Sequence, residues 1–235
     1  MESQKVNEMF ETIAYSYDFQ TSFLSLGIDT IWRKILARHV LAGKGASVLD
    51  AATGTGELCL KICRHRPGIH IVGLDIVPRM LGLAKKKIEA SPFKNCTSLA
   101  LGDGRYLPLQ RESVDVVTMA FGIRNIKERH QVLKEFSRVL KTGGQLLVME
   151  FGFPRHPFVR RLYRFYFDHV MPPLGNWLSR TDYAYSYLVQ SVYDFPEEGE
   201  FCNEIESAGF RIRTVKQLTF GIAKIYEAVK IRPSS

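Results

Sequence analysis

The chain contains little cysteine, with four cysteines among 235 residues. That number is too small for the disulfide framework that stabilises many secreted domains, and it agrees with a reducing compartment. The sequence also lacks a run of about 18 apolar residues and a recognisable N-terminal signal peptide, so neither a membrane span nor secretion is indicated. We therefore expect a cytoplasmic protein.

A metal-binding signature is missing as well. Cys59, Cys63 and His65 lie close together in the sequence, but both cysteines fall on the apolar side of a predicted helix. No second pair of ligands follows at the spacing of a zinc finger. We expect no metal site.

Acidic residues are fewer than basic ones, because 24 aspartates and glutamates stand against 32 lysines and arginines and give a net charge of +8. Such an excess suits a nucleic acid, an anionic membrane surface or a negatively charged ligand, and charge alone does not separate these partners. With 46% hydrophobic residues, the chain is long and apolar enough to bury the core of one α/β domain.

Apolar runs and amphipathic stretches alternate from residue 46 onward. The runs are nearly continuous, as in strands buried on both faces of a parallel sheet. They predict strands at 46–51, 69–75, 96–101, 113–121 and 145–151, and helices that begin at about 57, 80 and 127. Two alternating segments, 212–218 and 222–229, predict a β-hairpin at the sheet edge. The pattern is that of a doubly wound, seven-stranded and mostly parallel α/β sheet.

Two regions lie outside this alternation. Residues 1–45 are helical in pattern, and we expect them to form a lid or a packing layer. Residues 152–195 form an aromatic, basic and helical insert that we expect to cover a substrate site. Helical spacing divides part of this insert into an apolar side, with Phe158, Leu162, Phe165, Tyr166 and Val170, and a polar side, with Arg160, Arg161, Arg164 and Asp168.

Two interpretations of this amphipathic helix are open. In the first, the apolar side packs on the sheet and the basic side is solvated. In the second, the apolar side forms a wall for an isoprenoid tail while the arginines rest on anionic lipid. The second interpretation predicts a peripheral contact with the inner face of a membrane.

The first predicted strand runs into a glycine-rich turn in the stretch VLDAATGTGE. Gly54 and Gly56 allow a sharp turn and let a ligand approach the free N–H groups of the next helix. The third glycine of a dinucleotide-binding fingerprint is absent because Cys59 stands there, and the lysine of a P-loop is absent too. Asp50, earlier on the strand, instead indicates a ligand with a positively charged amino group.

Two further carboxylates follow the next two strands. Asp75 ends the second strand, where a carboxylate can bind both hydroxyls of a ribose. Asp103, between Gly102 and Gly104, is placed to accept a hydrogen bond from an adenine amino group. Because ligands of open α/β sheets bind at the carboxyl ends of the strands, these carboxylates predict one shared binding edge.

At these residues the chain resembles the class I S-adenosylmethionine-dependent methyltransferases, whose glycine motif reads acidic-x-Gly-x-Gly-x-Gly. Ala52 occupies the first glycine position. Nearly the whole chain also resembles the ubiquinone/menaquinone biosynthesis C-methyltransferase family, most specifically in FGIRN at 121–125 and YLVQSVYDFP at 187–196.

The resemblance implies a Rossmann-like class I methyltransferase fold in which residues 46–235 form the domain that binds S-adenosylmethionine. It implies cofactor contacts at Asp50, Gly54, Thr55, Gly56, Asp75, Asp103 and Gly104. Four positions depart from the family, which commonly has Gly, Asp, Asn and Ser where this chain has Thr53, Glu57, Thr21 and Ala120. The last two changes remove polar groups, which puts any contact made there in question.

The resemblance further implies methyl transfer to a ring carbon of a prenylated hydroquinone in respiratory quinone biosynthesis. It favours demethylmenaquinol as the substrate, with the benzoquinol step of ubiquinone biosynthesis as the alternative. The ring carbon becomes nucleophilic when a neighbouring hydroxyl loses its proton, so the protein must stabilise an oxyanion. Arg124 is expected to do so, and Asn125 to orient a hydroxyl or a water. The proton acceptor is open among His169, Tyr17, Tyr185 and a water.

Two other functions fit some of these features. The basic and aromatic insert suits RNA, although FGIRN stands where amino-methylating RNA or DNA methyltransferases carry Asn/Asp-Pro-Pro-Tyr/Phe. A non-catalytic scaffold with the same fold is the second alternative, and the set of Asp50, Gly54, Gly56 and Asp75 argues against it. We expect no nucleic-acid partner, and a homo-oligomer is left open.

Overall fold

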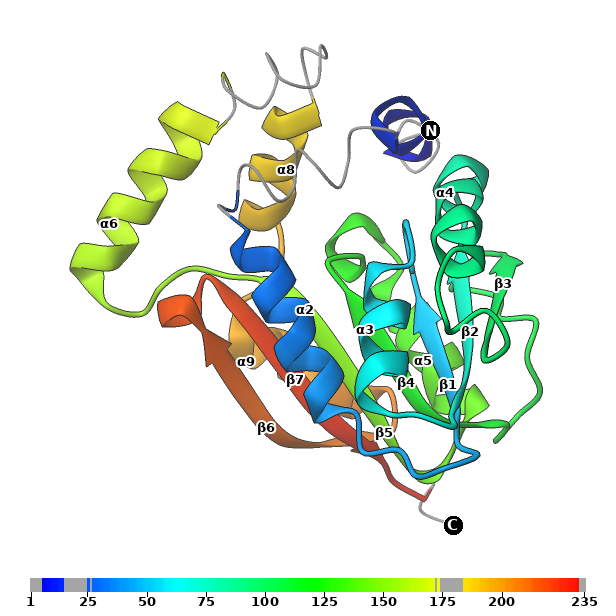
Figure 1. The fold of residues 1–235 in the computed structure, drawn as a ribbon. Helices are drawn as coiled ribbons and strands as arrows, with labels where there is room; N and C mark the ends of the chain where they lie inside the picture. Colours follow the sequence, from blue (N-terminus) through cyan, green and yellow to red (C-terminus); the bar gives the residue numbers. More distant parts are fainter. Residues whose placement is uncertain (1–5, 15–24, 26, 172, 174–183, 233–235) are drawn as a thin grey trace.

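One seven-stranded sheet forms the centre of the chain (Figure 1). A computed structural model gives this fold and describes residues 6–14, 25, 27–171, 173 and 184–232. The strand order is β3-β2-β1-β4-β5-β7-β6, and the first five strands of that order are parallel. The strands are β1 (Ser47–Ala51), β2 (His70–Asp75), β3 (Thr97–Leu101), β4 (Val114–Ala120), β5 (Leu140–Phe151), β6 (Phe210–Leu218) and β7 (Ala223–Lys230). The predicted doubly wound sheet is confirmed.

Helices cover both faces of the sheet, and alternate residues of each central strand contact opposite layers. Val48 and Val116 belong to one buried cluster, whereas Leu49 and Val117 belong to another. The first layer holds α2 (Ile28–His39) and α3 (Glu57–His65), and the second holds α5 (Arg129–Val139) and α9 (Glu198–Ser207). Because both faces are buried, the strands carry the nearly continuous apolar runs seen in the sequence.

The C-terminal hairpin closes one edge of the sheet, as predicted. β7 lies between β5 and β6 and is antiparallel to both. The last strand, β7, therefore pairs with the parallel part of the sheet, and β6 forms the outer edge. A short 3-10 turn, η3 (Thr219–Gly221), connects the two hairpin strands.

The N-terminal region contributes two helices to different parts of the molecule. Residues 6–14 form a helix that lies beside α4 (Pro78–Glu89) in Figure 1. Arg79 of α4 donates a hydrogen bond to the carbonyl of Glu11 at 2.8 Å and pairs with its carboxylate. α2, in contrast, belongs to the layer on the sheet, so the described part of residues 1–45 includes both a cover and a packing helix.

The insert forms a cover at the carboxyl end of the sheet. α6 (Pro157–Phe165) continues into a π-helical turn, η2 (Tyr166–Val170), and α8 (Ala184–Tyr193) follows. Figure 1 shows α6 standing away from the sheet, with α8 between α6 and the helix of residues 6–14.

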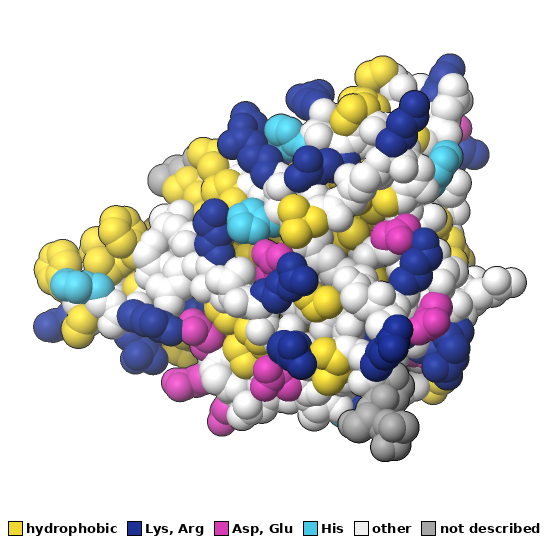
Figure 2. Space-filling model, turned by 90° about the horizontal axis from the view of Figure 1, so that it is seen from below, with side chains coloured by type: hydrophobic (Ala, Val, Ile, Leu, Met, Phe, Trp, Pro, Cys, Tyr) yellow, Lys and Arg dark blue, Asp and Glu magenta, His cyan; other side chains and the backbone are white. Residues whose placement is uncertain are grey.

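Much of the apolar side of α6 faces outward. Phe158 and Phe165 are 72% and 59% exposed, and hydrophobic side chains gather over this helix at the left edge of Figure 2. On the polar side, the guanidinium groups of Arg160 and Arg164 lie 5.9 and 5.3 Å from the ring centroid of Phe153, whereas Arg161 and Asp168 are exposed. The interpretation that α6 packs its apolar side on the sheet is therefore wrong, although the basic side is solvated at Arg161 and Arg164 as that interpretation expects.

In the described ranges, helices are too short or too polar to cross a lipid bilayer.

Candidate functional site

The turn between β1 and α3 has a left-handed backbone at three positions. Ala52, Gly54 and Gly56 have φ angles of 52°, 56° and 80°. Glycine adopts this conformation freely, whereas an alanine is disfavoured there by about 1 kcal/mol. A Cβ on Gly56 would lie 3.2 Å from the Cβ of Ala84, so this glycine also lets the turn pack closely on α4.

Asp50 is buried beneath this turn. One carboxylate oxygen accepts a hydrogen bond from the hydroxyl of Thr118 at 2.7 Å, and the other accepts from the hydroxyl of Thr53 at 2.7 Å. Burial raises the pKa of Asp50, although these hydrogen bonds and one from Cys59 lower it. Asp50 therefore supports the turn from below, and Thr53, a departure from the family, contributes to that support.

Thr55 and Gly56 complete the turn before α3. The Thr55 hydroxyl accepts a hydrogen bond from Nζ of Lys87 at 3.1 Å, which ties the turn to α4. Neither residue lines the two cavities described below, and neither does Asp50. Their predicted contacts with the cofactor stay predictions.

Asp75 and Asp103 occupy the next two strand ends, as expected. The carboxylate of Asp75 accepts hydrogen bonds from the N–H groups of Gly54 at 2.7 Å and Val77 at 2.9 Å. Burial raises the pKa of Asp75 in spite of these donors. Burial would also raise the pKa of Asp103, but the hydrogen bonds and charge of Arg105 outweigh burial and lower it.

A cavity of about 160 Å³ opens above these strand ends. Four of the predicted cofactor residues line it, namely Gly54, Asp75, Asp103 and Gly104. The carboxylates supply acceptors for hydroxyl and amino groups, and Val77, Met80 and Ile126 supply an apolar surface for a flat ring. The residues present therefore fit the adenosine part of the cofactor that the resemblance implies.

A second cavity, of about 470 Å³, is larger and mostly apolar. Its walls come from the helix of residues 6–14, from α2, α6 and α8, and from residues at the strand ends. Its lining includes Trp32, Phe121, Phe151, Leu162, Tyr163 and Tyr187. Such a lining suits a greasy, ring-containing ligand with few polar groups.

The two cavities share a wall. Phe10 and Phe121 line both of them, and Ala120 and Gly122 line the smaller one next to Phe121. Phe121 has a φ of 60°, a conformation that non-glycine residues rarely adopt and that gathers at functional sites. A ligand in the larger cavity would therefore lie against the cofactor cavity at Phe121.

Arg124 lines the larger cavity and pairs with a buried carboxylate. Its Nη1 donates hydrogen bonds to Glu150 at 2.8 Å and to the carbonyl of Phe121 at 2.7 Å, and its Nε donates to Ser191 at 3.2 Å. The guanidinium also lies 5.2 Å from the ring centroid of Phe151. Among the described residues, none accepts a hydrogen bond from Nη2 of Arg124.

Asn125 lines the smaller cavity, so the structure assigns the two predicted catalytic residues to different cavities. The side-chain oxygen of Asn125 accepts a hydrogen bond at 3.3 Å from the hydroxyl of Tyr187, which lines the larger cavity. This bond therefore joins the two walls.

Of the candidates for the proton acceptor, the structure describes only the side chain of His169. His169 is exposed and stacks on Phe165, with ring centroids 5.1 Å apart, and it lines neither cavity. Tyr17, Thr21 and the side chain of Tyr185 lie outside the described residues. Ala120, where the family commonly has serine, lines the smaller cavity.

Glu150 and Asp29 belong to the site although the sequence patterns did not single them out. Glu150 stands inside the apolar run LLVMEF and is completely buried in β5. A charged residue in a buried strand needs an oppositely charged partner, so Glu150 could have indicated an ion pair, and Arg124 is that partner. Asp29 starts α2 and is spaced to pair with Arg33, a pattern that is common on exposed helices and therefore carries little information alone.

Comparison with known proteins finds one matching family model, described as the ubiE/COQ5 methyltransferase family, over residues 1–230. A "Ubiquinone/menaquinone biosynthesis C-methyltransferase UbiE" of Geotalea uraniireducens is 41% identical over 228 residues, which cover 97% of each chain. A "Demethylmenaquinone methyltransferase" of Deinococcus radiodurans is 41% identical over 223 residues, which cover 95% of this chain and 91% of the relative.

Solved structures with the same fold are more distant in sequence. The cyclase SpnF aligns with a TM-score of 0.72 and 14% identity, covering 99% of this chain and 98% of its own. A geranyl diphosphate methyltransferase in complex with SAM aligns with a TM-score of 0.64 and 13% identity, covering 86% and 85%. At these identities the likeness shows the fold alone, which is the predicted Rossmann-like class I fold.

Proposed function

The chain belongs to the ubiE/COQ5 methyltransferase family, and from that premise we propose that it methylates a ring carbon of a prenylated hydroquinone, with demethylmenaquinol as the substrate. As a member of this family it is an S-adenosylmethionine-dependent C-methyltransferase. The observation that supports the substrate is the large apolar cavity, which meets the cofactor cavity at Phe121 and holds Arg124 in its wall.

The reaction joins a methyl group to a ring carbon and releases the proton of that carbon. S-adenosylmethionine, when bound, supplies the electrophilic methyl group. The protein makes the ring nucleophilic by favouring loss of the proton of the adjacent hydroxyl, because the resulting negative charge spreads onto the ring carbon. Arg124 stabilises that oxyanion through Nη2, while Glu150 and the Phe121 carbonyl hold the guanidinium in place through Nη1.

Cofactor binding belongs to the smaller cavity. Asp75 and Asp103 hold the ribose and adenine there, and Gly54 and Gly104 let the backbone approach them. Asp50, Thr55 and Gly56 hold the turn that carries Gly54. Asn125 orients the substrate hydroxyl or a water between the cavities, with Tyr187 fixing its side chain.

A methyl-transfer assay tests the substrate. The protein is incubated with labelled S-adenosylmethionine and, in separate reactions, with demethylmenaquinol, a demethylated benzoquinol precursor or bulk RNA. Label in the naphthoquinol is expected. Label in the benzoquinol alone would assign the ubiquinone step, and label in RNA alone would overturn the proposal.

Removing Arg124 alone would leave Glu150 as an unpaired buried charge, at a cost of about 3–5 kcal/mol in stability. Two variants avoid this problem. Arg124→Lys keeps the charge opposite Glu150, and a double variant, Arg124→Gln with Glu150→Gln, removes both charges. We expect kcat to fall by about 10²–10³-fold in the double variant, with cofactor affinity nearly unchanged.

Arg129 provides the matched control for Arg124. It pairs with Glu204 through Nε and Nη2 at 2.9 Å each and lies 5.8 Å from the ring centroid of Phe195, outside both cavities. Arg129→Gln with Glu204→Gln should leave kcat unchanged. Equal losses in the two double variants, or full kcat after removal of Arg124, would contradict the role.

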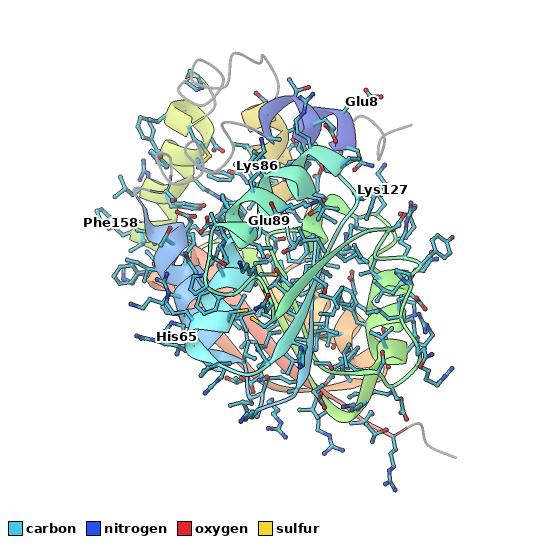
Figure 3. All side chains as sticks on the ribbon, turned by 45° about the vertical axis from the view of Figure 1, so that its right-hand side comes forward. Glu8, His65, Lys86, Glu89, Lys127 and Phe158 are labelled. Carbon is cyan, nitrogen blue, oxygen red and sulfur yellow. The ribbon has the colours of Figure 1, made fainter. Side chains whose placement is uncertain are left out.

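The outward side of α6 binds an anionic membrane surface. Phe158 and Phe165 are exposed there, and Figure 3 shows Phe158 at the outer edge of the molecule. Val159 and Leu162 of the same helix line the large cavity, so a membrane contact at α6 places lipid next to the entrance for a prenyl tail. The exposed Arg161 and the net charge of +8 favour anionic headgroups.

Flotation with vesicles tests this contact. The wild-type protein should bind phosphatidylglycerol vesicles more strongly than phosphatidylcholine vesicles. Phe158→Ser with Phe165→Ser should lose most of that binding, whereas Leu41→Ser, at a residue that is 62% exposed elsewhere, should keep it. Unchanged binding of the α6 variant would show that another surface meets the membrane.

A further inference from the structure

Asp29 is a carboxylate in the wall of the large apolar cavity. Its side chain is buried, and it lines the cavity together with Ser25 and Trp32. One oxygen accepts a hydrogen bond from the hydroxyl of Ser25 at 2.8 Å, and the other pairs with Nη1 of Arg33. A carboxylate can accept about four hydrogen bonds, so each oxygen retains capacity for a donor in the cavity.

Aromatic rings connect Asp29 to Arg124. The rings of Phe121 and Phe151 lie 4.5 Å apart, and Trp32 is 6.1 Å from each of them. All three rings line the cavity, so they offer a flat apolar surface on which another ring can stack.

Two arginines lie beside these three rings, and each arginine is paired with a buried carboxylate. The guanidinium of Arg33 lies 5.3 Å from the centroid of Phe121, and that of Arg124 lies 5.2 Å from the centroid of Phe151. At the Arg124 pair it is the cation that lines the cavity, whereas at the Arg33 pair it is the anion, Asp29. The cavity therefore presents a donor and an acceptor beside the same aromatic surface.

We propose that Asp29 makes the site selective for the reduced hydroquinone over the oxidised quinone by accepting a hydrogen bond from the hydroxyl para to the one that Arg124 binds. This inference rests on the proposed function of the cavity. Both ring oxygens of a hydroquinone carry hydrogen, whereas both oxygens of a quinone are acceptors only. Arg124 can donate to either form, so it does not distinguish them.

The distinction arises at Asp29. A hydroquinone hydroxyl donates to the carboxylate, whereas a quinone carbonyl brings two buried acceptors together with no hydrogen between them. A site built around a hydroxyl rejects an analogue that lacks it, because its own polar group is left unpaired. The selection matches the chemistry, since the ring of an oxidised quinone lacks the hydroxyl whose ionisation activates the carbon.

Anaerobic calorimetry tests the proposal without methyl transfer. The probes are a short-chain para-naphthoquinone, its reduced naphthoquinol and the dimethyl ether of that quinol, each titrated into protein saturated with S-adenosylhomocysteine. The wild-type protein should bind the naphthoquinol about ten- to a hundredfold more tightly than the quinone or the ether. Asp29→Asn should reduce the difference between quinol and quinone to about threefold or less, because an amide also donates. Asp29→Glu should retain the preference.

The control is Asp115→Asn, which makes the same chemical change outside both cavities, where Asp115 pairs with Lys141. It should leave the preference intact, and S-adenosylhomocysteine binding reports whether each variant is folded. Wild-type binding of neither redox form would overturn the proposed function and this inference with it. A quinol preference that persists in Asp29→Asn, or tight binding of the ether by the wild-type protein, would overturn the inference alone.

Discussion

Gly122 is adjacent to the shared wall of the two cavities, where the chain has no room for another side chain. A Cβ at this position would lie 2.7 Å from the Cβ of Ala52 and 3.4 Å from the side chain of Met119. The contact with Ala52 is shorter than real Cβ contacts allow, so one backbone segment of the cofactor cavity would have to move. A glycine at position 52, as in the general class I glycine motif, would remove this conflict.

This geometry predicts a rescue. Gly122→Ala should weaken S-adenosylmethionine binding by about tenfold or more, because overpacking of this kind costs about 1–3 kcal/mol. Adding Ala52→Gly should restore most of the affinity, since it removes the clashing methyl group and relieves a left-handed alanine.

Calorimetric titration of the wild-type protein, both single variants and the double variant measures the coupling between the two positions. Ala52→Gly alone serves as the control and should bind at least as well as the wild-type protein. If the losses of the single variants simply add in the double variant, the two side chains do not compete for the same space.

We expect Asp50 and Asp75 to make cofactor affinity depend on pH. Burial raises the pKa of both carboxyls above the ordinary value of 3.8. A raised folded-state pKa means that their contribution to stability is present below 3.8 and is lost as the pH rises through the higher folded value. The predicted contact between the amino group of the cofactor and Asp50 would favour the ionised form, so cofactor binding should weaken on acidification through that same window.

The measurement is the affinity for S-adenosylmethionine as the pH falls toward 3.8. Affinity should decrease in the wild-type protein, and Asp50→Asn should have a lower affinity with a flatter profile. Asp103→Asn is the control, because the pKa of Asp103 is lowered and its loss should leave the slope unchanged. A steep profile in Asp50→Asn would assign the titration to another group.

At the scale of the element, α9 illustrates how a helix end is fixed by its own sequence. Glu197 and Glu200 form a capping box, in which the Glu197 N–H donates to the Glu200 carboxylate at 3.3 Å. The helix then buries Phe201 and Ile205 against the sheet. The cap therefore positions the helix that covers the C-terminal hairpin.

Removal of this cap should lower stability without touching the site. Glu200→Ala should reduce the free energy of unfolding by about 0.5–1 kcal/mol, whereas Glu200→Gln, which keeps an acceptor, should stay close to the wild-type value. Urea denaturation followed by circular dichroism measures both. Equal losses in the two variants would point to the charge of Glu200 and not to its hydrogen bond.

Strands that are buried on both faces were predictable from the sequence. The orientation of an amphipathic helix, which can turn either face to the protein, was not. β1 and β2 are mostly apolar because helices cover both of their faces, and their apolar runs therefore favour a buried strand. α6 is amphipathic, and a pattern of two faces does not state which face meets the protein. The folded chain decides it, because Phe158 and Phe165 are left exposed while Arg164 lies over the rings of Phe153 and Tyr193.

The site shows the same division. Asp75 and Asp103 were predictable because one is the last residue of its strand and the other lies two residues past its strand, and parallel strands end at one edge. The pair of Arg124 and Glu150 joins residues 26 positions apart on neighbouring segments, and only the pairing of β4 with β5 brings them together. The role of Asp29 could not be predicted for the same reason, because only the folded chain places it in one cavity with Trp32, Phe121 and Phe151.

At the scale of the whole molecule, the excess of basic residues acts together with the exposed side of α6. The net charge is +8, and screening reduces such long-range attraction, with a Debye length of about 8 Å at physiological ionic strength. Vesicle binding should therefore have an electrostatic part, which depends on salt, and an apolar part, which does not.

Salt titration separates the two parts. Binding to phosphatidylglycerol vesicles should fall as salt rises from about 0.05 to about 0.5 M, while the weaker binding to phosphatidylcholine vesicles should stay constant. Phe158→Ser with Phe165→Ser should lower both curves by a similar factor. Salt-independent binding to anionic vesicles would mean that the net charge plays no part in membrane recognition.

The helix of residues 6–14 gives the molecule one further property. Asn7 and Phe10 line the cofactor cavity, while Met9, Phe10 and Ile13 line the larger one. A ligand in either cavity buries part of the same short helix and so stabilises it for the other ligand. Because coupling between binding free energies is reciprocal, cofactor and hydroquinone should each raise the other's affinity by the same factor.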